Sequence, residues 1–354
     1  MREFVLDTRL PRVVFGAGTL QRLGAELDRL GLSRALLLST PGQAALAARA
    51  AAAIGARVAG VFAQAAMHVP VEVARAACDE ARRVGADCTV AVGGGSTTGL
   101  AKAVAFESGL PIIAVPTTYA GSEMTSMYGL TEAGLKRTGR DLRVYPVCVV
   151  YDAELSAGLP FAVTRVSLMN ALAHAAEGLY APDGNPLVDL MAEEGIRLGA
   201  ATLPRLQRDP GDLEARGDAL VCAWLCGTVM GSITVGLHHK LCHTLGGSFG
   251  LPHAEVHAVI LPHAIGYNAA AVPRAMQTMA GALQAASAAR GFFDLNARHG
   301  GPTALQSIGM QAEDLDRAAA LAVKDQYPNP RPLELVPVRR LLQRAFAGKP
   351  PAEE

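Results

Sequence analysis

Six of the nine histidines in this sequence lie in one stretch, Gly236 to Asn268, which reads GLHHKLCHTLGGSFGLPHAEVHAVILPHAIGYN. Histidine changes its charge near neutral pH, and its ring nitrogens can bind metals, donate hydrogen bonds or exchange protons. Packing alone gives no reason to gather this residue type in one segment. The stretch is therefore the first candidate for chemistry.

Spacing within the stretch suggests how its histidines meet. His239 and His243 are four residues apart and would share one face of a helix from about Val235 to Leu245. Three glycines and Pro252 follow, and we expect them to break this helix and turn the chain. Such a turn would bring His253 back toward the face that the helix has just presented.

A second segment, SLMNALAHAAEGLY, has the same spacing. Asn170 and His174 are four residues apart in a run of apolar residues that predicts a buried helix. Two helices that each present such a polar pair to an apolar interior are a common way to build a metal site. However, Asn170 brings an amide and no charge, so we expect low metal affinity and histidines that serve as hydrogen-bond donors and acids.

A glycine-rich turn follows an apolar strand in the first half of the chain. The predicted strand from Cys88 to Val92 runs into a turn and a helix start whose residues are Gly93, Gly94, Gly95, Ser96 and Thr97. Glycines let backbone N–H groups approach a phosphate closely, and a helix N-terminus adds partial positive charge. The segment is neither GxGxxG nor a P-loop, but it predicts a pyrophosphate site.

A second polar turn, PTTYAGSE from Pro116 to Glu123, follows the next predicted strand. Ligands of parallel sheets bind beyond the carboxyl ends of neighbouring strands. We therefore expect Thr117, Thr118 and Ser122 to contribute to the same nucleotide site.

The elements that position these residues predict two domains. Short apolar runs alternate with helical patterns up to about Leu155, which favours βαβ units and a parallel sheet. The expected strands are 12–15, 35–39, 58–63, 88–92, 112–116 and 147–152, and the expected helices are 19–30, 43–54, 71–84 and 97–107. Beyond that point Ala, Leu, Met and Glu recur at helical spacing. We predict an α/β dinucleotide-binding domain over residues 1–155 and an all-α catalytic domain over residues 156–354.

Composition excludes several classes of protein. Half of the 354 residues are hydrophobic, and 32 Lys and Arg balance 32 Asp and Glu, so charge gives no case for nucleic acid or a membrane surface as partner. No apolar run suits a signal peptide or a membrane span. The six cysteines form no CxxC pair, which together with the missing signal predicts reduced thiols in a cytoplasm.

Several motifs, in this order and spacing, resemble the maleylacetate reductase branch of the iron-containing alcohol dehydrogenase group. They are GGGSTTGLAKA, PTTYAGSEMTSMYGLTE, LKRTGRD, MNALAHAAEGLY, the histidine stretch and YPNPRP. The match runs from about Phe15 to Arg331. It implies an N-terminal dinucleotide-binding α/β domain with a helical C-terminal domain, which is also the dehydroquinate synthase-like plan.

The resemblance also identifies positions for a metal. The broader group uses an aspartate and three histidines, which fall here on Asn170, His174, His239 and His253. The aspartate has become Asn170, as is typical of the maleylacetate reductase branch, and another aspartate of the group is replaced by Gly99. We therefore expect no bound metal; if one is present, the three histidines are its ligands.

The reaction that the resemblance implies is reduction of the carbon–carbon double bond of 2-maleylacetate to 3-oxoadipate by NADH or NADPH, in aromatic-compound catabolism. A conjugated dianion needs no metal to polarise an isolated carbonyl if donor groups hold its carboxylates and oxyanion. A cluster of histidines can supply those donors.

The resulting hypothesis gives each group a role. After hydride transfer, donors from His174, His239 and Asn170 stabilise the enolate, and His243 or His253 supplies the proton. Tyr327 and Arg331, around the NPRP turn, are expected to help bind the carboxylates. Lys136 is expected to reach the nicotinamide ribose or a phosphate.

Cofactor choice and assembly are also predicted. Thr40, Pro41 and Gly42 follow the second strand, and none offers the carboxylate that would grip the adenosine ribose and repel a 2′-phosphate. We expect tolerance of both NADH and NADPH, and a homodimer, as is common in the family.

Three alternatives stay open at this point. The first is a metal-dependent alcohol or aldehyde dehydrogenase of the same family, and Asn170 argues against it. A carbon–oxygen lyase of the dehydroquinate synthase type would need more cations for a substrate phosphate. A repurposed homologue acting on another small oxo acid is the third. Two histidines of the long stretch, His257 and His263, are expected to be core residues and not ligands.

Overall fold

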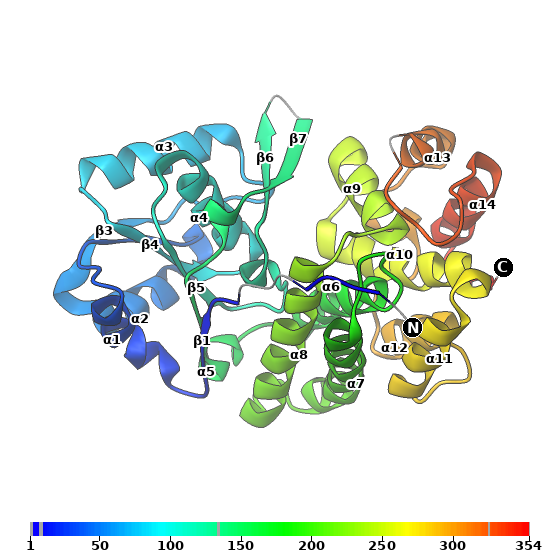
Figure 1. The fold of residues 1–354 in the computed structure, drawn as a ribbon, viewed down its shortest axis with the longest axis horizontal. Helices are drawn as coiled ribbons and strands as arrows, with labels where there is room; N and C mark the ends of the chain where they lie inside the picture. The colour runs from blue at the N-terminus through cyan, green and yellow to red at the C-terminus, as the bar shows by residue number, and fades with distance from the viewer. Residues whose placement is uncertain (1–2, 7–9, 133–134, 325, 354) are drawn as a thin grey trace. The chain divides into compact units, whose positions relative to one another are not determined.

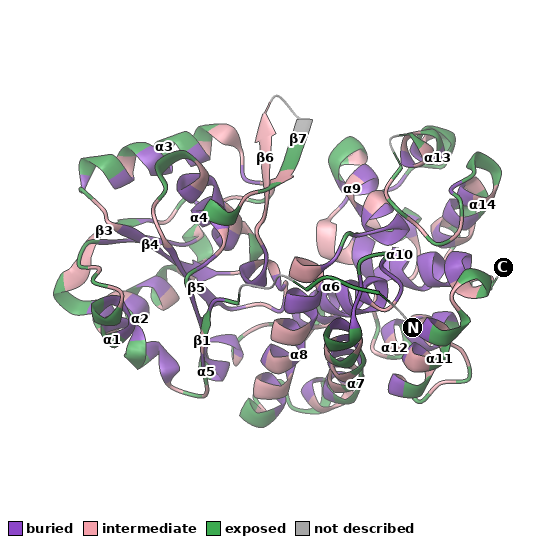
Figure 2. Ribbon diagram, in the orientation of Figure 1, coloured by how far each residue is buried: buried purple, intermediate pink, exposed green. Residues whose placement is uncertain are grey.

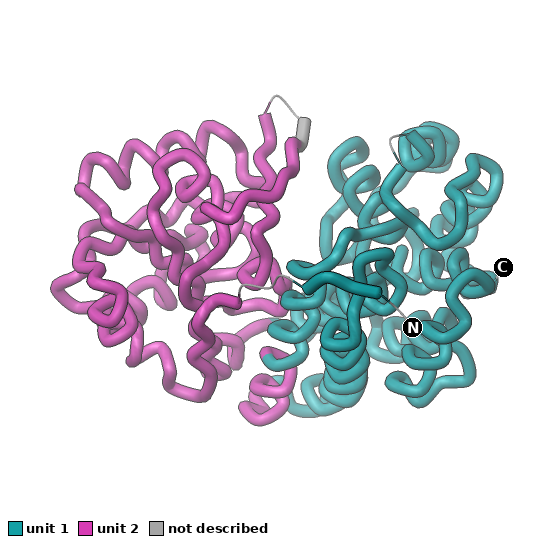
Figure 3. Tube along the Cα trace, in the orientation of Figure 1, with its two compact units in different colours: residues 1–8, 160–210, 221–354 teal, residues 9–159, 211–220 magenta. Residues whose placement is uncertain are grey.

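The computed structural model describes residues 3–6, 10–132, 135–324 and 326–353. The chain divides into two compact units (Figure 3). One, called here the sheet unit, comprises Arg9–Leu159 and Gly211–Leu220; the other, the helical unit, holds Pro160–Pro210 and Val221–Glu354 with the first eight residues. The predicted domain boundary after residue 155 stays a prediction.

The sheet unit contains one six-stranded sheet in which every pair is parallel, in the order β1-β8-β5-β4-β2-β3. Figure 1 labels β1, β3, β4 and β5 of this sheet. Its strands are β1 Arg12–Phe15, β2 Ala35–Leu38, β3 Val58–Phe62, β4 Cys88–Gly93, β5 Ile112–Pro116 and β8 Cys148–Tyr151. The four central strands, β8, β5, β4 and β2, are buried throughout and match continuous apolar runs, which buried parallel strands favour, whereas the edge strands β1 and β3 are only partly buried. The predicted parallel α/β domain is confirmed.

Helices flank this sheet. They are α1 Leu23–Arg29, α2 Ala44–Ile54, α3 Val71–Arg83, α4 Gly95–Ser108 and the short α5 Ala153–Ser156. One hydrophobic cluster packs α3 and α4 against the sheet, and another packs α1 and α2 against it.

The register of the sheet places the two polar turns next to each other. Gly93 pairs with Pro116, so β4 and β5 end side by side at the carboxyl edge. The backbone N–H of Thr117 then donates to the carbonyl of Gly93 at 3.0 Å. The two turns are therefore adjacent, as the sequence predicts.

An antiparallel hairpin that the sequence analysis did not predict follows the second turn. It consists of β6 Met127–Glu132 and β7 Leu135–Arg140. Lys136 lies on β7, opposite Thr131, but its side chain lies outside the described residues.

The helical unit confirms the prediction of an all-α second half. Its helices are α6 Phe161–Gly178, α7 Pro186–Arg208, α9 Leu237–Phe249, α10 His253–Asn268, α11 Pro273–Ala282, α12 Ala288–Arg298, α13 Leu315–Val323 and α14 Leu335–Phe346. Helix α8 Leu213–Ser232 belongs to the sheet unit up to Leu220 and to the helical unit from Val221. Helix α10 is buried without interruption from Val256 to Asn268 (Figure 2). A helix that is apolar on every face belongs at the centre of a bundle, and α10 packs against α6, α9, α12 and α14.

Helix α9 differs from its prediction. Gly246 and Gly247 do not break it, and it continues to Phe249, where Gly250 ends it in the left-handed conformation. Isolated glycines weaken a helix by about 1 kcal/mol each relative to alanine, which packing against a hydrophobic core can offset. Among the described residues, no single helix has the length and apolar composition of a membrane span; only α8 and α9 together, bent by 98°, meet those criteria.

Candidate active site

The N-terminus of α9 is fixed by a buried carboxylate from α6. Glu177 accepts hydrogen bonds from the backbone N–H of Gly236 at 3.0 Å and of His238 at 2.8 Å. It also accepts one from Nδ1 of His239 at 2.6 Å. A helix N-terminus leaves its first N–H groups without helical partners and favours negative charge, so Glu177 caps α9 and orients His239 in one arrangement.

Six imidazoles from α6, α9 and α10 form one cluster, called here the imidazole cluster: His174, His238, His239, His243, His253 and His257. The ring centroids of His174 and His239 are 5.2 Å apart and stacked. Those of His239 and His243 are 6.0 Å apart, and those of His253 and His257 are 4.5 Å apart. The structure therefore brings together the four histidines that the sequence singled out.

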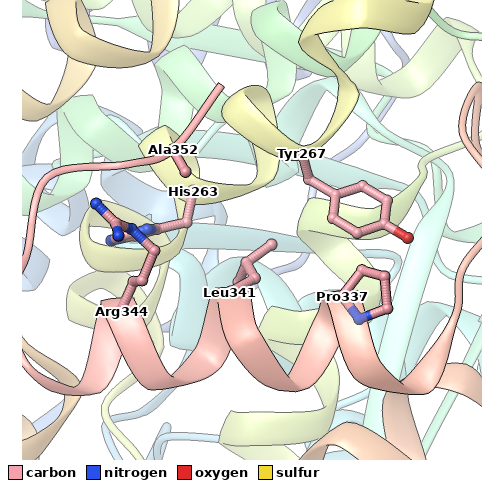
Figure 4. A pocket seen from close by; sticks show the side chains of 6 residues that line it. All are labelled: His263, Tyr267, Pro337, Leu341, Arg344 and Ala352. Carbon is pink, nitrogen blue, oxygen red and sulfur yellow. The ribbon is translucent and has the colours of Figure 1, made fainter. Parts of the chain in front are cut away.

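His257, which the sequence analysis placed in the core, is buried but belongs to this cluster. Its ring centroid is 5.2 Å from that of His239, and its Nδ1 is 2.8 Å from Nε2 of His238. Its position four residues after His253 on α10 was the signal available in the sequence. His263 is different: it lines a separate cavity of about 10 Å³, space for about one water molecule, beside Tyr267 and Arg344 (Figure 4).

Burial keeps several of these imidazoles neutral. It lowers the pKa of His174, His238 and His257 well below the ordinary value, and neighbouring histidines lower each pKa further. Five buried atoms around the cluster have no hydrogen-bond partner among the described residues: Asn170 Oδ1, His174 Nδ1, His238 Nδ1, His239 Nε2 and His257 Nε2. Buried polar atoms without partners are costly, so such a concentration marks a place for a polar ligand.

The turn that carries YPNPRP brings one of its two predicted residues to the cluster. The hydroxyl of Tyr327 is 3.1 Å from Nδ1 of His243. Burial raises the pKa of Tyr327, and Glu177 adds to the shift, so this phenol stays protonated at neutral pH. Arg331 instead stacks on the ring of Tyr267 at 4.2 Å and donates to its carbonyl at 3.0 Å.

The residues present do not fit a resident divalent ion. The set Asn170, His174, His239 and His253 contains no carboxylate, and the ligand atoms of its histidines are not all within 4.8 Å of one another. Among the described residues, only His238, Cys242 and His257 meet that distance. In that group the facing nitrogens of the two histidines already share a hydrogen bond, and their outer nitrogens lack the acceptors that metal-bound imidazoles normally have.

In the sheet unit, the glycine turn fits tightly against the second polar turn. A Cβ on Gly93 would lie 2.3 Å from Oγ1 of Thr97, and one on Gly94 would lie 2.9 Å from Oγ1 of Thr118. Only glycine leaves this backbone open for close approach of a phosphate. Gly95 begins α4, with Ser96 in its first turn.

Gln43, which the sequence analysis did not assign, holds the second turn from the side. It follows β2 and donates from Nε2 to Oγ1 of Thr117 at 2.9 Å. Its Oε1 would lie 2.6 Å from a Cβ on Gly93, so the same side chain contacts both turns.

Close packing also explains why position 99 holds a glycine. A Cβ at this position would lie 2.8 Å from Cγ2 of Val69. Val69 and His68 both adopt positive φ, at 48° and 63°, which is rare for a β-branched residue. The strained pair is tied to β6 by Thr131, whose Oγ1 donates to the carbonyl of His68 at 2.8 Å and whose N–H donates to that of Val69 at 3.1 Å.

Two buried cations reach the second turn, and neither was predicted. Lys102 of α4 contacts the segment from Ser122 to Met127. Arg216 of α8, fully buried, donates to the hydroxyl of Tyr119 at 3.0 Å and to the carbonyl of Leu159 at 2.8 Å. A lysine flanked on both sides by apolar residues, as in GLAKAVAF, was the signal for the first of them.

Comparison with known protein families gives matches over both halves of the chain. Residues 11–153 match the model of iron-containing alcohol dehydrogenase, and residues 164–346 match that of the Fe-containing alcohol dehydrogenase family, C-terminal. Maleylacetate reductase from Burkholderia cepacia is 59% identical over 99% of this chain and 100% of that protein. Maleylacetate reductase from Pseudomonas sp. (strain P51) is 54% identical over 99% of each chain.

Solved structures are also similar to this chain over nearly its full length. The crystal structure of maleylacetate reductase from Rhizobium sp. strain MTP-10005 superimposes with a TM-score of 0.95 at 51% identity, covering 99% of this chain and 100% of that one. An iron-containing alcohol dehydrogenase from Corynebacterium glutamicum gives a TM-score of 0.94 at 39% identity, covering 98% and 97%.

Proposed function

Because this chain belongs to the iron-containing alcohol dehydrogenase family, and within it to the maleylacetate reductases, we propose that it reduces the carbon–carbon double bond of 2-maleylacetate to 3-oxoadipate with NADH or NADPH. The observation that carries the proposal is the imidazole cluster beside Asn170, with unpartnered buried atoms and no carboxylate ligand. This set suits a dianionic substrate, because its charges and its enolate need donors.

The chemistry balances in two steps. Hydride passes from the dihydronicotinamide to the alkene carbon that is β to the ketone, which oxidises the cofactor and moves the electron pair of the double bond into an enolate. A proton then adds to the neighbouring carbon and gives the saturated ketone. The protein must therefore stabilise the enolate oxygen and supply one proton.

We assign stabilisation of the enolate oxygen to His239, His174 and Asn170. Glu177 accepts the Nδ1 hydrogen of His239, so Nε2 carries a hydrogen only when the ring is an imidazolium. In that form it donates from Nε2 while Glu177 balances its charge. The neutral ring of His174 and the amide of Asn170 add uncharged donors beside it.

His243 or His253 supplies the proton. The contact between His243 and the Tyr327 hydroxyl supports the first of these, because the hydroxyl oxygen can accept the Nδ1 hydrogen of a protonated imidazole and so orient the ring. His253 has the support of its place in the imidazole cluster. Binding of the substrate carboxylates is assigned to the same histidines with Tyr327, while Arg331 has less support because Tyr267 already holds it.

The nucleotide is assigned to the turns at the carboxyl edge of the sheet. Gly93, Gly94, Gly95, Ser96 and Thr97 would hold the pyrophosphate, and Thr117, Thr118 and Ser122 would contact it from the second turn, with Lys136 on the hairpin as a further contact. The segment after β2, Thr40 to Gly42, brings no carboxylate, which supports use of both cofactors. A very strong preference for NADH in parallel kinetics would contradict dual use.

We also propose that catalysis needs no metal and that the enzyme is a homodimer. The donor set described above supports the first proposal. The second is supported by β1, an edge strand of the sheet, beside which the apolar side chains of Phe15 and Val147 are exposed. Light scattering would give about twice the chain mass for a dimer.

The decisive experiment compares substrates on one preparation purified without chelators. We expect rapid loss of NADH absorbance with maleylacetate, no comparable turnover of simple alcohols, and unchanged activity after chelation. Stoichiometric zinc or iron whose removal abolishes activity would overturn the metal-free mechanism. Turnover of alcohols but not of maleylacetate would overturn the proposed substrate.

A further inference from the structure

We propose that Lys102 is a positioning residue for the nicotinamide dinucleotide, which it serves by tying helix α4 to the segment from Ser122 to Met127. The proposal rests on the proposed function in one respect, namely that the nucleotide binds at the two polar turns.

The ammonium group of Lys102 has an unusually complete set of acceptors. Nζ is 2.6 Å from the carbonyl of Ser122, 2.8 Å from that of Thr125 and 2.7 Å from that of Met127. It is also 2.9 Å from Oγ1 of Thr125 and 3.3 Å from Oγ of Ser122. An ammonium group has three hydrogens and accepts none, so the lysine is the donor in every contact and its three hydrogens are shared among the five acceptor atoms.

The charge of this lysine is deeply buried. Lys102 has no exposed surface, and burial lowers its pKa to about 7, although the Glu123 carboxylate opposes that shift. Glu123 is itself buried and accepts a hydrogen bond from the Tyr151 hydroxyl at 2.9 Å. Buried lysines are rare, and neither helix propensity nor core packing requires a cation at this position.

Lys102 connects two parts of the proposed nucleotide site, because its backbone lies on α4 and its amino group contacts the second polar turn. Lys102 lies seven residues after Gly95, two turns along α4, and therefore on the same face as the residue that begins the helix. Its head group binds Ser122 at the end of the second polar turn and the residues that follow it. Thr118 of the same turn packs on Gly94. Lys102 thus fixes the distance between the helix that faces the pyrophosphate and the turn that supplies the hydroxyl groups.

The test measures NADH binding without substrate, by titration of nicotinamide fluorescence, on wild type and Lys102→Met. We expect the Kd for NADH to rise at least tenfold. In steady-state kinetics, the KM for NADH should rise by a similar factor, while kcat at saturating NADH and the KM for maleylacetate stay within about threefold, because the helical unit keeps its donors. A general loss of structure would lower kcat as well.

A second pair of variants keeps the test valid if Lys102→Met does not fold. Thr125→Val keeps the shape of a side chain that Lys102 contacts and removes one acceptor, so the Kd should rise about threefold or more. Thr89→Val is its control, because Thr89 is equally buried on β4 but its hydroxyl has no partner among the described residues.

The outcomes separate the two claims. Wild type that binds neither NADH nor NADPH would refute the proposed function. If wild type binds NADH and the Kd of Lys102→Met lies within twofold of the wild-type Kd, the positioning role is refuted. If Lys102→Met does not fold, equal changes in Kd for Thr125→Val and Thr89→Val would refute it. A fall in kcat without a change in either NADH constant would also refute it.

Discussion

The carboxylate of Glu177 offers the sharpest test of the proposed mechanism, because one substitution changes its charge without changing its shape. In Glu177→Gln one carboxylate oxygen becomes an amide NH₂. Oε2 accepts from Gly236 N–H and His239 Nδ1, and Oε1 accepts from His238 N–H. Whichever way the amide turns, at least one of these three buried donors faces another donor.

The size of the effect follows from those contacts. A buried donor left without an acceptor costs about 1–3 kcal/mol of folding stability. Loss of the negative charge beside the His239 imidazolium removes a charge-assisted hydrogen bond worth about 1.5–3 kcal/mol. This loss affects only the states in which the His239 ring carries a positive charge. If the whole amount falls on the transition state, kcat decreases about 10- to 150-fold.

The assay is the rate of NADH oxidation at saturating maleylacetate, together with thermal unfolding and NADH titration. We expect a large fall in kcat, a lower unfolding temperature and an unchanged Kd for NADH, since Glu177 belongs to the helical unit. The control is Glu255→Gln, because Glu255 is an acidic residue in the first turn of α10 and its substitution removes a negative charge at a different helix N-terminus. A folded Glu177→Gln enzyme whose kcat stays within threefold of wild type would refute the role given to His239.

Three further predictions follow from the same geometry. Gly93→Ala forces a Cβ to within 2.6 Å of Gln43 and closer still to Thr97, so NADH affinity should fall at least tenfold by fluorescence titration, and an unchanged Kd would contradict the pyrophosphate site. Loss of the proton donor should lower kcat about 10²- to 10⁴-fold, so one of His243→Ala and His253→Ala must reach that range, and turnover within a few-fold of wild type for both would exclude them as donors. Finally, mild acid should destabilise the protein, because several histidines bind protons near pH 6.5 in the unfolded chain but stay neutral in the folded protein. Their contribution to the free energy of unfolding is present above pH 6.5 and should fall by about 5 kcal/mol by pH 5.5 in denaturant titrations. A free energy of unfolding that does not change over this pH range would contradict the lowered pKa values. The histidines concerned are His174, His238, His257 and His263.

Local patterns in the sequence predicted the elements and much of the cluster for physical reasons. Strand β4 and its glycine turn were visible because a buried parallel strand is a continuous apolar run, and because a tight turn before a helix requires glycine. His239 and His243 were visible because four-residue spacing puts side chains on one face of a helix. Each of these signals lies within about ten residues of sequence.

What the sequence could not supply were contacts between distant segments. Glu177 looked like an ordinary polar residue of α6, yet it caps α9 from 59 positions away along the chain. His257 looked like a core residue because apolar neighbours surround it, and only the packing of α10 beside α6 and α9 adds it to the cluster. The hairpin β6 and β7 was missed because β6 mixes apolar and polar residues and is only partly buried, and β7 is mostly polar, so neither has the continuous apolar run that marks the central strands of the sheet.

The residues missed in this way share a property that bears on how the enzyme is built. Glu177 and Lys102 are buried charges that bind backbone groups of another segment, a helix N-terminus in one case and a loop in the other. Removing one partner of a buried charge is strongly destabilising, so each fixes the element it binds far more firmly than an exposed ion pair could. The two act in different units, and each holds an element that carries predicted ligand-binding groups. If this account is right, Glu177→Gln alters kcat and leaves NADH affinity unchanged, Lys102→Met does the reverse, and the effects of the double variant on the two constants are additive within about 0.5 kcal/mol.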